Sequence, residues 1–117
     1  MRCLSLREPW ATAIFRLGKN VENRTWRTNF RGQLGIHVSR NVDTDSLRDL
    51  KLTTRDLFPL GCVVGFVELY DITENSQSTW AREDQFHWLI RSPILLPKPF
   101  PCRGQVQLFE ADVRPFR

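Results

Sequence analysis

The sequence lacks long hydrophobic runs and is poor in cysteine. No apolar stretch approaches the roughly 20 residues of a membrane-spanning helix, and the apolar part of the N-terminal segment is too short for a signal peptide. The three cysteines are widely spaced and form no C-x-x-C pair, a pattern typical of small buried residues in a reducing compartment. We therefore expect a cytosolic protein without a membrane partner.

Histidine is scarce as well, and several familiar catalytic motifs are missing. With only two histidines, His37 and His87, a zinc site is not expected, and no cofactor is predicted. Gly61 and Gly65 bracket a candidate strand rather than a strand-to-helix turn, so there is no glycine-rich phosphate loop. No Ser-His-Asp or Cys-His arrangement is recognisable. A lone histidine such as His37 is more often structural than catalytic.

The charge that is present is unevenly distributed. Residues 1–40 contain eight Lys or Arg and two Asp or Glu, whereas residues 41–117 contain nine and eleven. The basic residues are mainly arginines, fourteen against three lysines. Guanidinium groups match phosphate geometry and stack on bases, so this bias favours a nucleic-acid partner. A solvated basic face without a partner is the alternative that composition leaves open.

The length and the hydrophobic pattern predict one α+β domain, residues 1–117. Trp10, Ala13, Ile14 and Leu17 recur at helical spacing, and Gly18 follows where a left-handed cap is expected. Short strands with turn signals and two or three short helices indicate a small antiparallel barrel or a strongly curled sheet. The strands are predicted over residues 2–6, 20–27, 33–39, 61–72, 86–90 with 94–96, and 106–113, and a second helix over 43–51.

Two of these strands carry particular expectations. Residues 61–72 are apolar on both faces, which is typical of a central strand. Residues 97–101 contain three prolines and are predicted to lie outside any central strand, because proline donates no ladder hydrogen bond.

Several sequence elements together resemble an ASCH domain, a branch of the PUA-like superfamily. They are Leu-Ser-Leu-Arg-Glu-Pro-Trp-Ala at residues 4–11, Gly-Lys-Asn-Val-Glu-Asn-Arg at residues 18–24, Arg31-Gly32 before the strand that ends at Ser39, the strand 61–69, and Trp88 with residues 101–108. The resemblance covers nearly the whole chain. It implies a small PUA-like β-barrel with a helix-lined cleft, and a role with RNA or a modified nucleoside or nucleotide.

Members of this family differ in what they do, so the resemblance leaves three functions open. Some are RNA-binding modules, some are similar to ribonucleases, and one branch resembles amidohydrolases of acylated cytidine. That branch uses a lysine, a threonine three residues later and a glutamate from the central strand. By position, Lys19 matches the lysine and Glu68 is the candidate glutamate, but Glu22 replaces the threonine. A further alternative, which rests on the charge distribution, is a non-catalytic adaptor that uses its basic face.

The predicted chemical centre is Lys19, Glu22 and Glu68. Lys19 follows the end of a helix, whose partial negative charge favours an ammonium group there. Strand alternation places Glu22 beside Arg24, close enough for an ion pair. Glu68 lies in an apolar row, so its pKa is expected to be raised unless a cation pairs with it. A divalent ion held by Glu22 and Glu68 would have only these two ligands, and no metal site is predicted.

The predicted nucleic-acid contacts surround this centre. Trp26 shares the predicted face of Glu22 and Arg24 and is expected to be the better base platform, whereas core packing is expected for Trp10, with base stacking as its alternative. Ser5 and Ser39 are weaker candidates for hydrogen bonds to a ligand. The full set of predicted contacts is Arg7, Trp10, Arg24, Trp26, Arg27, Arg31 and Ser39.

Overall fold

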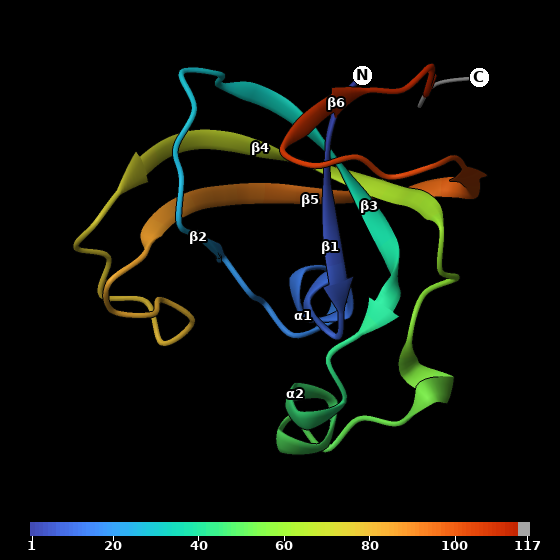
Figure 1. The fold of residues 1–117 in the computed structure, drawn as a ribbon, viewed down its shortest axis with the longest axis horizontal. Coiled ribbons are helices and arrows are strands. Elements are labelled where there is room, and N and C mark those ends of the chain that lie inside the picture. The colour runs from blue at the N-terminus through green and yellow to red at the C-terminus, as the bar shows by residue number, and fades with distance from the viewer. Residues whose placement is uncertain (115–117) are drawn as a thin grey trace.

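The structure is a computed structural model that describes residues 1–114; the last three residues of the predicted domain lie outside this range. Within it, six strands, two short helices and one 3-10 turn follow the chain (Figure 1). The predicted α+β class is confirmed. The elements are β1 (Arg2–Glu8), α1 (Trp10–Arg16), β2 (Val21–Arg24), β3 (Gly32–Val42), α2 (Thr44–Asp49), η1 (Thr54–Asp56), β4 (Cys62–Thr73), β5 (Phe86–Pro101) and β6 (Leu108–Glu110).

The strands of the described range form one curled sheet in the order β2-β5-β4-β3-β1-β6. β4 lies inside the sheet between β3 and β5, which confirms the prediction of a central strand. Figure 1 shows β4 and β5 crossing β1 and β3 at a steep angle. Because β2 and β6 form the two edges, the sheet is not closed into the barrel that the resemblance implied.

β1 and β3 run parallel, whereas the sequence pattern predicted an antiparallel arrangement throughout. The chain passes through α1 and β2 between these two strands, and such a crossover returns it in the same direction. α1 packs against β1, β3 and β5. The crossover therefore places α1, and the segment 18–24 that follows it, against one end of the sheet.

The two C-terminal strands also differ from prediction. β5 includes the proline segment 97–101, although its neighbour β2 pairs with β5 only as far as Leu89. Among residues 1–114, β4 is the only strand that pairs with β5 at the prolines, so the prediction that they lie outside a central strand is confirmed and their missing N–H groups are tolerated. β6 is shorter than the predicted 106–113 strand. Gln107 has a φ of 62°, which is not extended backbone, so β6 begins only at Leu108.

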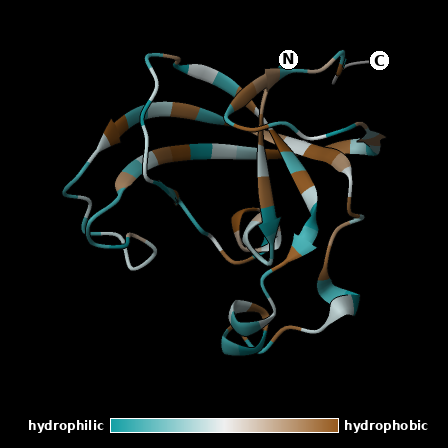
Figure 2. Ribbon diagram, viewed as in Figure 1, coloured by the Kyte–Doolittle hydropathy of each residue, from teal (hydrophilic) through white to brown (hydrophobic). Residues whose placement is uncertain are grey.

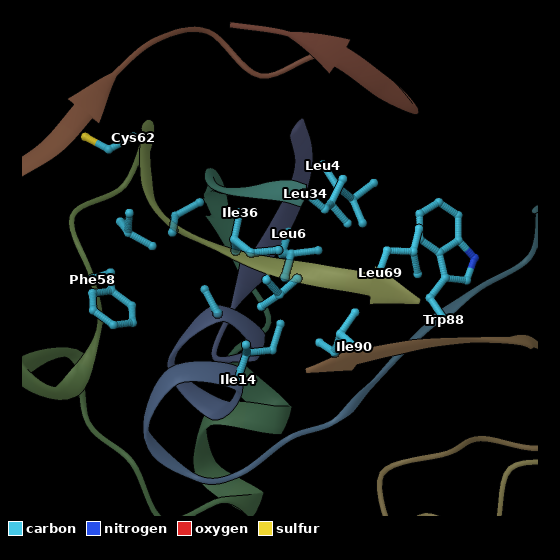
Figure 3. Close-up of a cluster of buried hydrophobic side chains, with 14 of the residues drawn as sticks. Leu4, Leu6, Ile14, Leu34, Ile36, Phe58, Cys62, Leu69, Trp88 and Ile90 are labelled. Atoms are coloured by element: carbon cyan, nitrogen blue, oxygen red, sulfur yellow. The ribbon is translucent and has the colours of Figure 1, made fainter. Parts of the chain in front are cut away.

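The hydrophobic core lies between α1 and the concave sheet. Leu4 and Leu6 from β1, Ile14 from α1, and Trp88 and Ile90 from β5 converge there (Figure 3). In Figure 2 the hydrophobic colour concentrates on the strands and α1, whereas the long loop between β4 and β5 is hydrophilic to neutral. No helix within residues 1–114 is long and apolar enough to cross a membrane.

The cysteines agree with the predicted role of small buried residues in two of three cases. Cys3 and Cys62 are buried, and Cys102 is half-buried. All are free thiols. Burial raises the pKa of the Cys3 thiol to about 11, so this group stays protonated and packs as an apolar side chain.

Glu8 is a fully buried carboxylate that fixes the start of α1. Its Oε1 accepts the Thr12 backbone N–H at 2.8 Å and its Oε2 accepts the Thr12 hydroxyl at 2.7 Å. Oε2 also accepts the Phe58 backbone N–H at 2.8 Å. These donors satisfy a buried group that would otherwise be costly. Glu8 therefore joins β1, α1 and the segment after η1 beside the candidate site.

Candidate functional site

A cavity of about 420 Å³ opens between the end of α1, β2 and the loop that precedes β5. We call it the Lys19 pocket. Its lining mixes aromatic, cationic, amide and acidic side chains from distant parts of the chain. They are Ser5, Arg7, Trp10, Lys19, Glu22, Asn23, Arg24, Asp43, Leu50, Thr79, Trp80, Ala81, Arg82 and Gln85.

Lys19, Glu22 and Arg24 form a linked row of charges in this pocket. Lys19 Nζ donates to Glu22 Oε1 at 2.9 Å and to the Val21 carbonyl oxygen. Arg24 Nη2 lies 3.1 Å from Glu22 Oε2 and donates to the Ser5 carbonyl oxygen at 3.0 Å. The side chains of Lys19 and Glu22 are only 2% and 11% exposed. The row is therefore fixed within the fold rather than floating at the surface.

The electrostatics of Glu22 follow from this arrangement. Burial alone would raise the pKa of the Glu22 carboxyl, but the charges of Lys19 and Arg24 and their hydrogen bonds bring it below its ordinary value. Glu22 is thus an anion held between two cations. Such a carboxylate accepts hydrogen bonds and orients its neighbours, and it does not donate a proton.

Local sequence explains how the row is positioned. Gly18 has a φ of 76°, the left-handed conformation predicted for the residue that ends α1. The Lys19 N–H then donates to the Ala13 carbonyl at 3.0 Å, which directs the chain back along α1. β2 follows at once, and its alternation places Glu22 and Arg24 on one face, as predicted.

Two tryptophans from opposite sides line the pocket. Trp10 lies at the start of α1, and its ring centroid is 5.5 Å from Lys19 Nζ, within cation–π range. Trp80 belongs to the loop before β5. Both side chains are half-buried. The pocket thus presents aromatic surface next to fixed charges.

Hydrogen bonds hold the loop that carries Trp80 against β2 and β5. Asn23 Nδ2 donates to the Trp80 carbonyl at 2.9 Å, and Asn23 Oδ1 accepts the Arg82 N–H at 2.9 Å. The buried His87 bonds to the Arg82 carbonyl through Nε2 at 2.6 Å and accepts the Ser76 N–H at Nδ1. Since a carbonyl only accepts, Nε2 carries the ring proton. The loop is therefore a fixed wall of the pocket.

The remaining cations of the pocket make no direct ion pair with another described residue, although after the hydrogen bonds from Ser46 the charge of Arg7 also helps to lower the pKa of Asp43. Within residues 1–114, the guanidinium groups of Arg7 and Arg82 take part in no ion pair and no hydrogen bond, and both side chains are exposed. Asp43 also lines the pocket, and the Asp43 carboxyl is hydrogen-bonded by Ser46, which holds its pKa below the ordinary value. Arg7 and Arg82 are thus available to an anionic ligand.

Comparison with known proteins places this arrangement in a family. A family model described as the ASCH domain matches residues 4–109. The chain belongs to the ASCH domain family. It is similar to the mouse and human proteins named activating signal cointegrator 1, each 27% identical over 128 aligned residues. Each match covers 94% of this chain and 22% of the relative, so this ASCH domain chain spans about one fifth of their length.

The ASCH fold brings together part of the predicted site. Arg7, Trp10, Lys19, Glu22 and Arg24 all line the Lys19 pocket. Trp10 contacts the core as expected, and it also lines the pocket.

Four predicted contact residues lie outside the Lys19 pocket. Trp26 packs edge-to-face on Trp88 with centroids 4.8 Å apart, and it does not line the pocket for which it was expected to be the better base platform. Arg27 lies over the Phe86 ring at 5.6 Å. Arg31 donates to backbone carbonyls in its own turn. Ser39 lines a different cavity of this ASCH domain.

Glu68 has a cationic partner, the condition under which its pKa was not expected to rise. Arg91 makes a two-pronged contact with it, Nε to Oε2 at 2.9 Å and Nη2 to Oε1 at 3.1 Å. These hydrogen bonds lower the pKa of the Glu68 carboxyl, as the prediction allowed for a carboxylate that a cation pairs with. Glu68 lies opposite Gln33 in the sheet and does not line the pocket with Lys19 and Glu22. Within residues 1–114 no group of three His, Cys, Asp or Glu could hold a metal ion.

Sequence reasoning missed the wall formed by the loop before β5. Trp80, Arg82 and Gln85 line the pocket, and Asn23 both lines it and anchors the loop. The one available signal was a tryptophan two residues from an arginine in an otherwise polar loop. Such a tryptophan has no local core to join, which is typical of an aromatic that serves a ligand.

Proposed function

We propose that this ASCH domain binds a nucleotide unit of single-stranded RNA in the Lys19 pocket. The observation that carries the proposal is the combination of Trp10 and Trp80 with the unpaired guanidinium groups of Arg7 and Arg82 in one cavity of about 420 Å³. Aromatic rings stack bases, and arginine forks bind phosphate oxygens. Membership of the ASCH family supports RNA, because the family resemblance implies a role with RNA or modified nucleosides.

Each part of the pocket has a separate task in this proposal. Trp10 and Trp80 stack the base, and Arg7 and Arg82 contact the phosphate groups. The Lys19–Glu22–Arg24 row offers the base edge fixed donors and acceptors, since its members are already oriented by each other. Asn23 and Gln85 add amide groups that both donate and accept.

Hydrolysis is the second candidate, either of RNA or of an acylated cytidine. It is favoured by the position of Lys19, which matches the catalytic lysine of the amidohydrolase branch. It has less support than binding, because the Lys19 ammonium is engaged by Glu22 and Val21. In addition, the candidate glutamate, Glu68, pairs with Arg91 instead.

The test of binding uses a labelled single-stranded RNA and fluorescence anisotropy. Arg82→Gln removes an unpaired cation from the pocket and should weaken binding several-fold, with a smaller salt dependence. The matched control is Arg55→Gln, because Arg55 is equally exposed but lies outside the pocket. Equal affinity of both variants and the wild type would refute a phosphate contact at Arg82.

Product analysis by mass spectrometry separates the two candidates. The wild-type protein is incubated with an RNA pool and with N4-acetylcytidine, beside Lys19→Met. New products that disappear in the variant would establish catalysis, and their masses would distinguish strand cleavage from deacylation. Unchanged substrates, together with RNA binding, are expected for the proposed binding module.

A further inference from the structure

A second cavity, of about 730 Å³, lies on the other side of β1 from the segment that carries Lys19 and Glu22. We call it the His37 pocket. Its walls are β3, the turn before β4 and the segment between β5 and β6, which passes across β1 and β3 in Figure 1. The lining includes Ser5, His37, Ser39, Arg40, Arg103 and Gly104.

The charge of the His37 pocket has one sign. Arg40 and Arg103 both line it, and neither guanidinium makes an ion pair or a hydrogen bond within residues 1–114. None of the described lining residues is Asp or Glu. The Arg40 guanidinium lies against Gly61, where an added Cβ would be 2.9 Å from Nη2. Two guanidinium groups without ion pairs, in a cavity without carboxylates, are suited to binding an anion.

The base of the pocket is a hydrogen-bonded pair, Ser5 and His37. His37 is 2% exposed, and its Nε2 lies 2.8 Å from the Cys102 carbonyl oxygen, so Nε2 carries the proton. His37 Nδ1 shares a hydrogen bond of 2.8 Å with the Ser5 hydroxyl. The segment after β5 approaches this pair so closely that a Cβ at Gly104 would be 2.7 Å from His37 Cε1.

Ser5 connects the two cavities. It lines both, and its carbonyl oxygen accepts the hydrogen bond from Arg24 in the Lys19 pocket. The two cavities thus meet at Ser5, and each contains two arginines without an ion pair among the described residues: Arg7 and Arg82 in one, Arg40 and Arg103 in the other.

We propose that the His37 pocket binds the phosphate of an adjacent nucleotide, so that one RNA strand passes over Ser5 and occupies both cavities. This inference rests on the proposed function of the Lys19 pocket and extends it. A site of two cavities selects a strand over a free nucleotide, because only a strand carries phosphates at both positions. The ligand class is therefore an oligonucleotide of at least two residues.

The test compares two probes, UMP and hexauridylate, by quenching of tryptophan fluorescence. For the wild type, hexauridylate should bind at least about tenfold more tightly than UMP, since the second cavity adds phosphate contacts. The double variant Arg40→Gln/Arg103→Gln should lose most of this advantage while its affinity for UMP is unchanged. Arg48→Gln/Arg55→Gln removes two exposed arginines outside both cavities and is the matched control.

A second variant tests the same cavity without changing charge. Gly104→Ala places a Cβ against His37 and Ser5, so the segment between β5 and β6 must shift at the pocket wall. Hexauridylate affinity should fall and UMP affinity should not. If neither variant reduces the hexauridylate advantage, the second cavity is overturned and the Lys19 pocket stands. If the wild type binds neither probe, both proposals fail.

Discussion

Lys19 and Glu22 are a buried ion pair in a small domain, and such a pair is held at a cost. Removing two charges from water is expensive, and mutual attraction offsets it only where the geometry is good. Here the geometry supplies a third member, Arg24, and a backbone acceptor, Val21. Three largely buried charges are expected to stabilise the fold no more than apolar side chains of similar volume would. This is consistent with a role of the three residues in ligand recognition.

The pH dependence of stability tests this row. The folded state holds the pKa of Glu22 below its unfolded value near 4.5, so the stabilisation is present above that pH and is lost as the pH falls through the folded value. Glu22→Gln should be destabilised at pH 7 by about 3–5 kcal/mol, because two cations lose their partner. It should also lose less stability than the wild type in acid. Urea unfolding from pH 7 to pH 3 measures both effects.

Two variants make the acid experiment decisive. Glu68→Gln breaks an exposed pair and should behave almost like the wild type. If Glu22→Gln does not fold, Lys19→Met takes its place in the acid experiment, because it removes one cation and leaves Glu22 paired with Arg24. An acid profile of Glu22→Gln that matches the wild type would contradict the assigned role of the carboxylate.

The tryptophans give the second prediction at this scale. Trp80→Ala should weaken binding of single-stranded RNA by about 1–3 kcal/mol, the usual worth of stacking one base, which is about 5- to 150-fold in Kd. Trp80→Phe should recover much of the loss. Trp26→Phe is the control, because Trp26 contacts Trp88 outside the pocket and should change thermal stability rather than affinity. Anisotropy and thermal unfolding of the three variants settle the assignment.

At the scale of elements, local sequence patterns were sufficient to predict a helix or strand where buried residues recur at regular spacing along one segment. The apolar spacing of α1, the cap at Gly18 and the two-sided hydrophobicity of β4 are all local, and the structure confirms them except for Leu17, which follows α1 and is exposed. The parallel pairing of β1 with β3 was missed, because it depends on a crossover rather than on the composition of either strand. The long β5 was missed because its prolines are tolerated only where β2 has ended.

The candidate site also has one part that local sequence predicted and one part that it did not. The residues from 7 to 24 were predicted because they form a short motif beside a helix end. The opposite wall was missed because Trp80 and Arg82 reach the pocket through hydrogen bonds with Asn23, more than fifty residues away in the chain. No local pattern encodes such a contact.

This wall supplies the element-scale prediction. The Ser78 hydroxyl donates to Asn20 Oδ1 at 2.6 Å and accepts the Trp80 N–H at 3.1 Å, but Ser78 does not line the pocket. Ser78→Ala should therefore weaken RNA binding several-fold through the position of Trp80, with faster amide hydrogen exchange at residues 78–82. Gln77→Ala, in the same loop, is the control. Unchanged affinity with faster exchange would show that the position of this wall does not matter for binding.

At the scale of the whole molecule, the fold rearranges the charge that the sequence shows. The basic excess belongs to residues 1–40, yet each cavity pairs an arginine from that region with one from the C-terminal part. Arg7 meets Arg82 in the Lys19 pocket, and Arg40 meets Arg103 in the His37 pocket. The sequence therefore predicted a negatively charged partner, but not the path that we propose for it.

The salt dependence of binding measures that path. If Arg7, Arg82, Arg40 and Arg103 each neutralise one phosphate of a single strand, the logarithm of the association constant should fall with the logarithm of salt concentration with a slope of about −2.8. Affinity for hexauridylate should then fall about 50-fold between 50 and 200 mM salt. Arg103→Gln should reduce the slope by about 0.7, whereas Arg55→Gln should leave it unchanged. A slope near zero for the wild type would mean that stacking and hydrogen bonds hold the strand without phosphate contacts. A wild-type slope of half the expected value would mean that the strand occupies only one cavity.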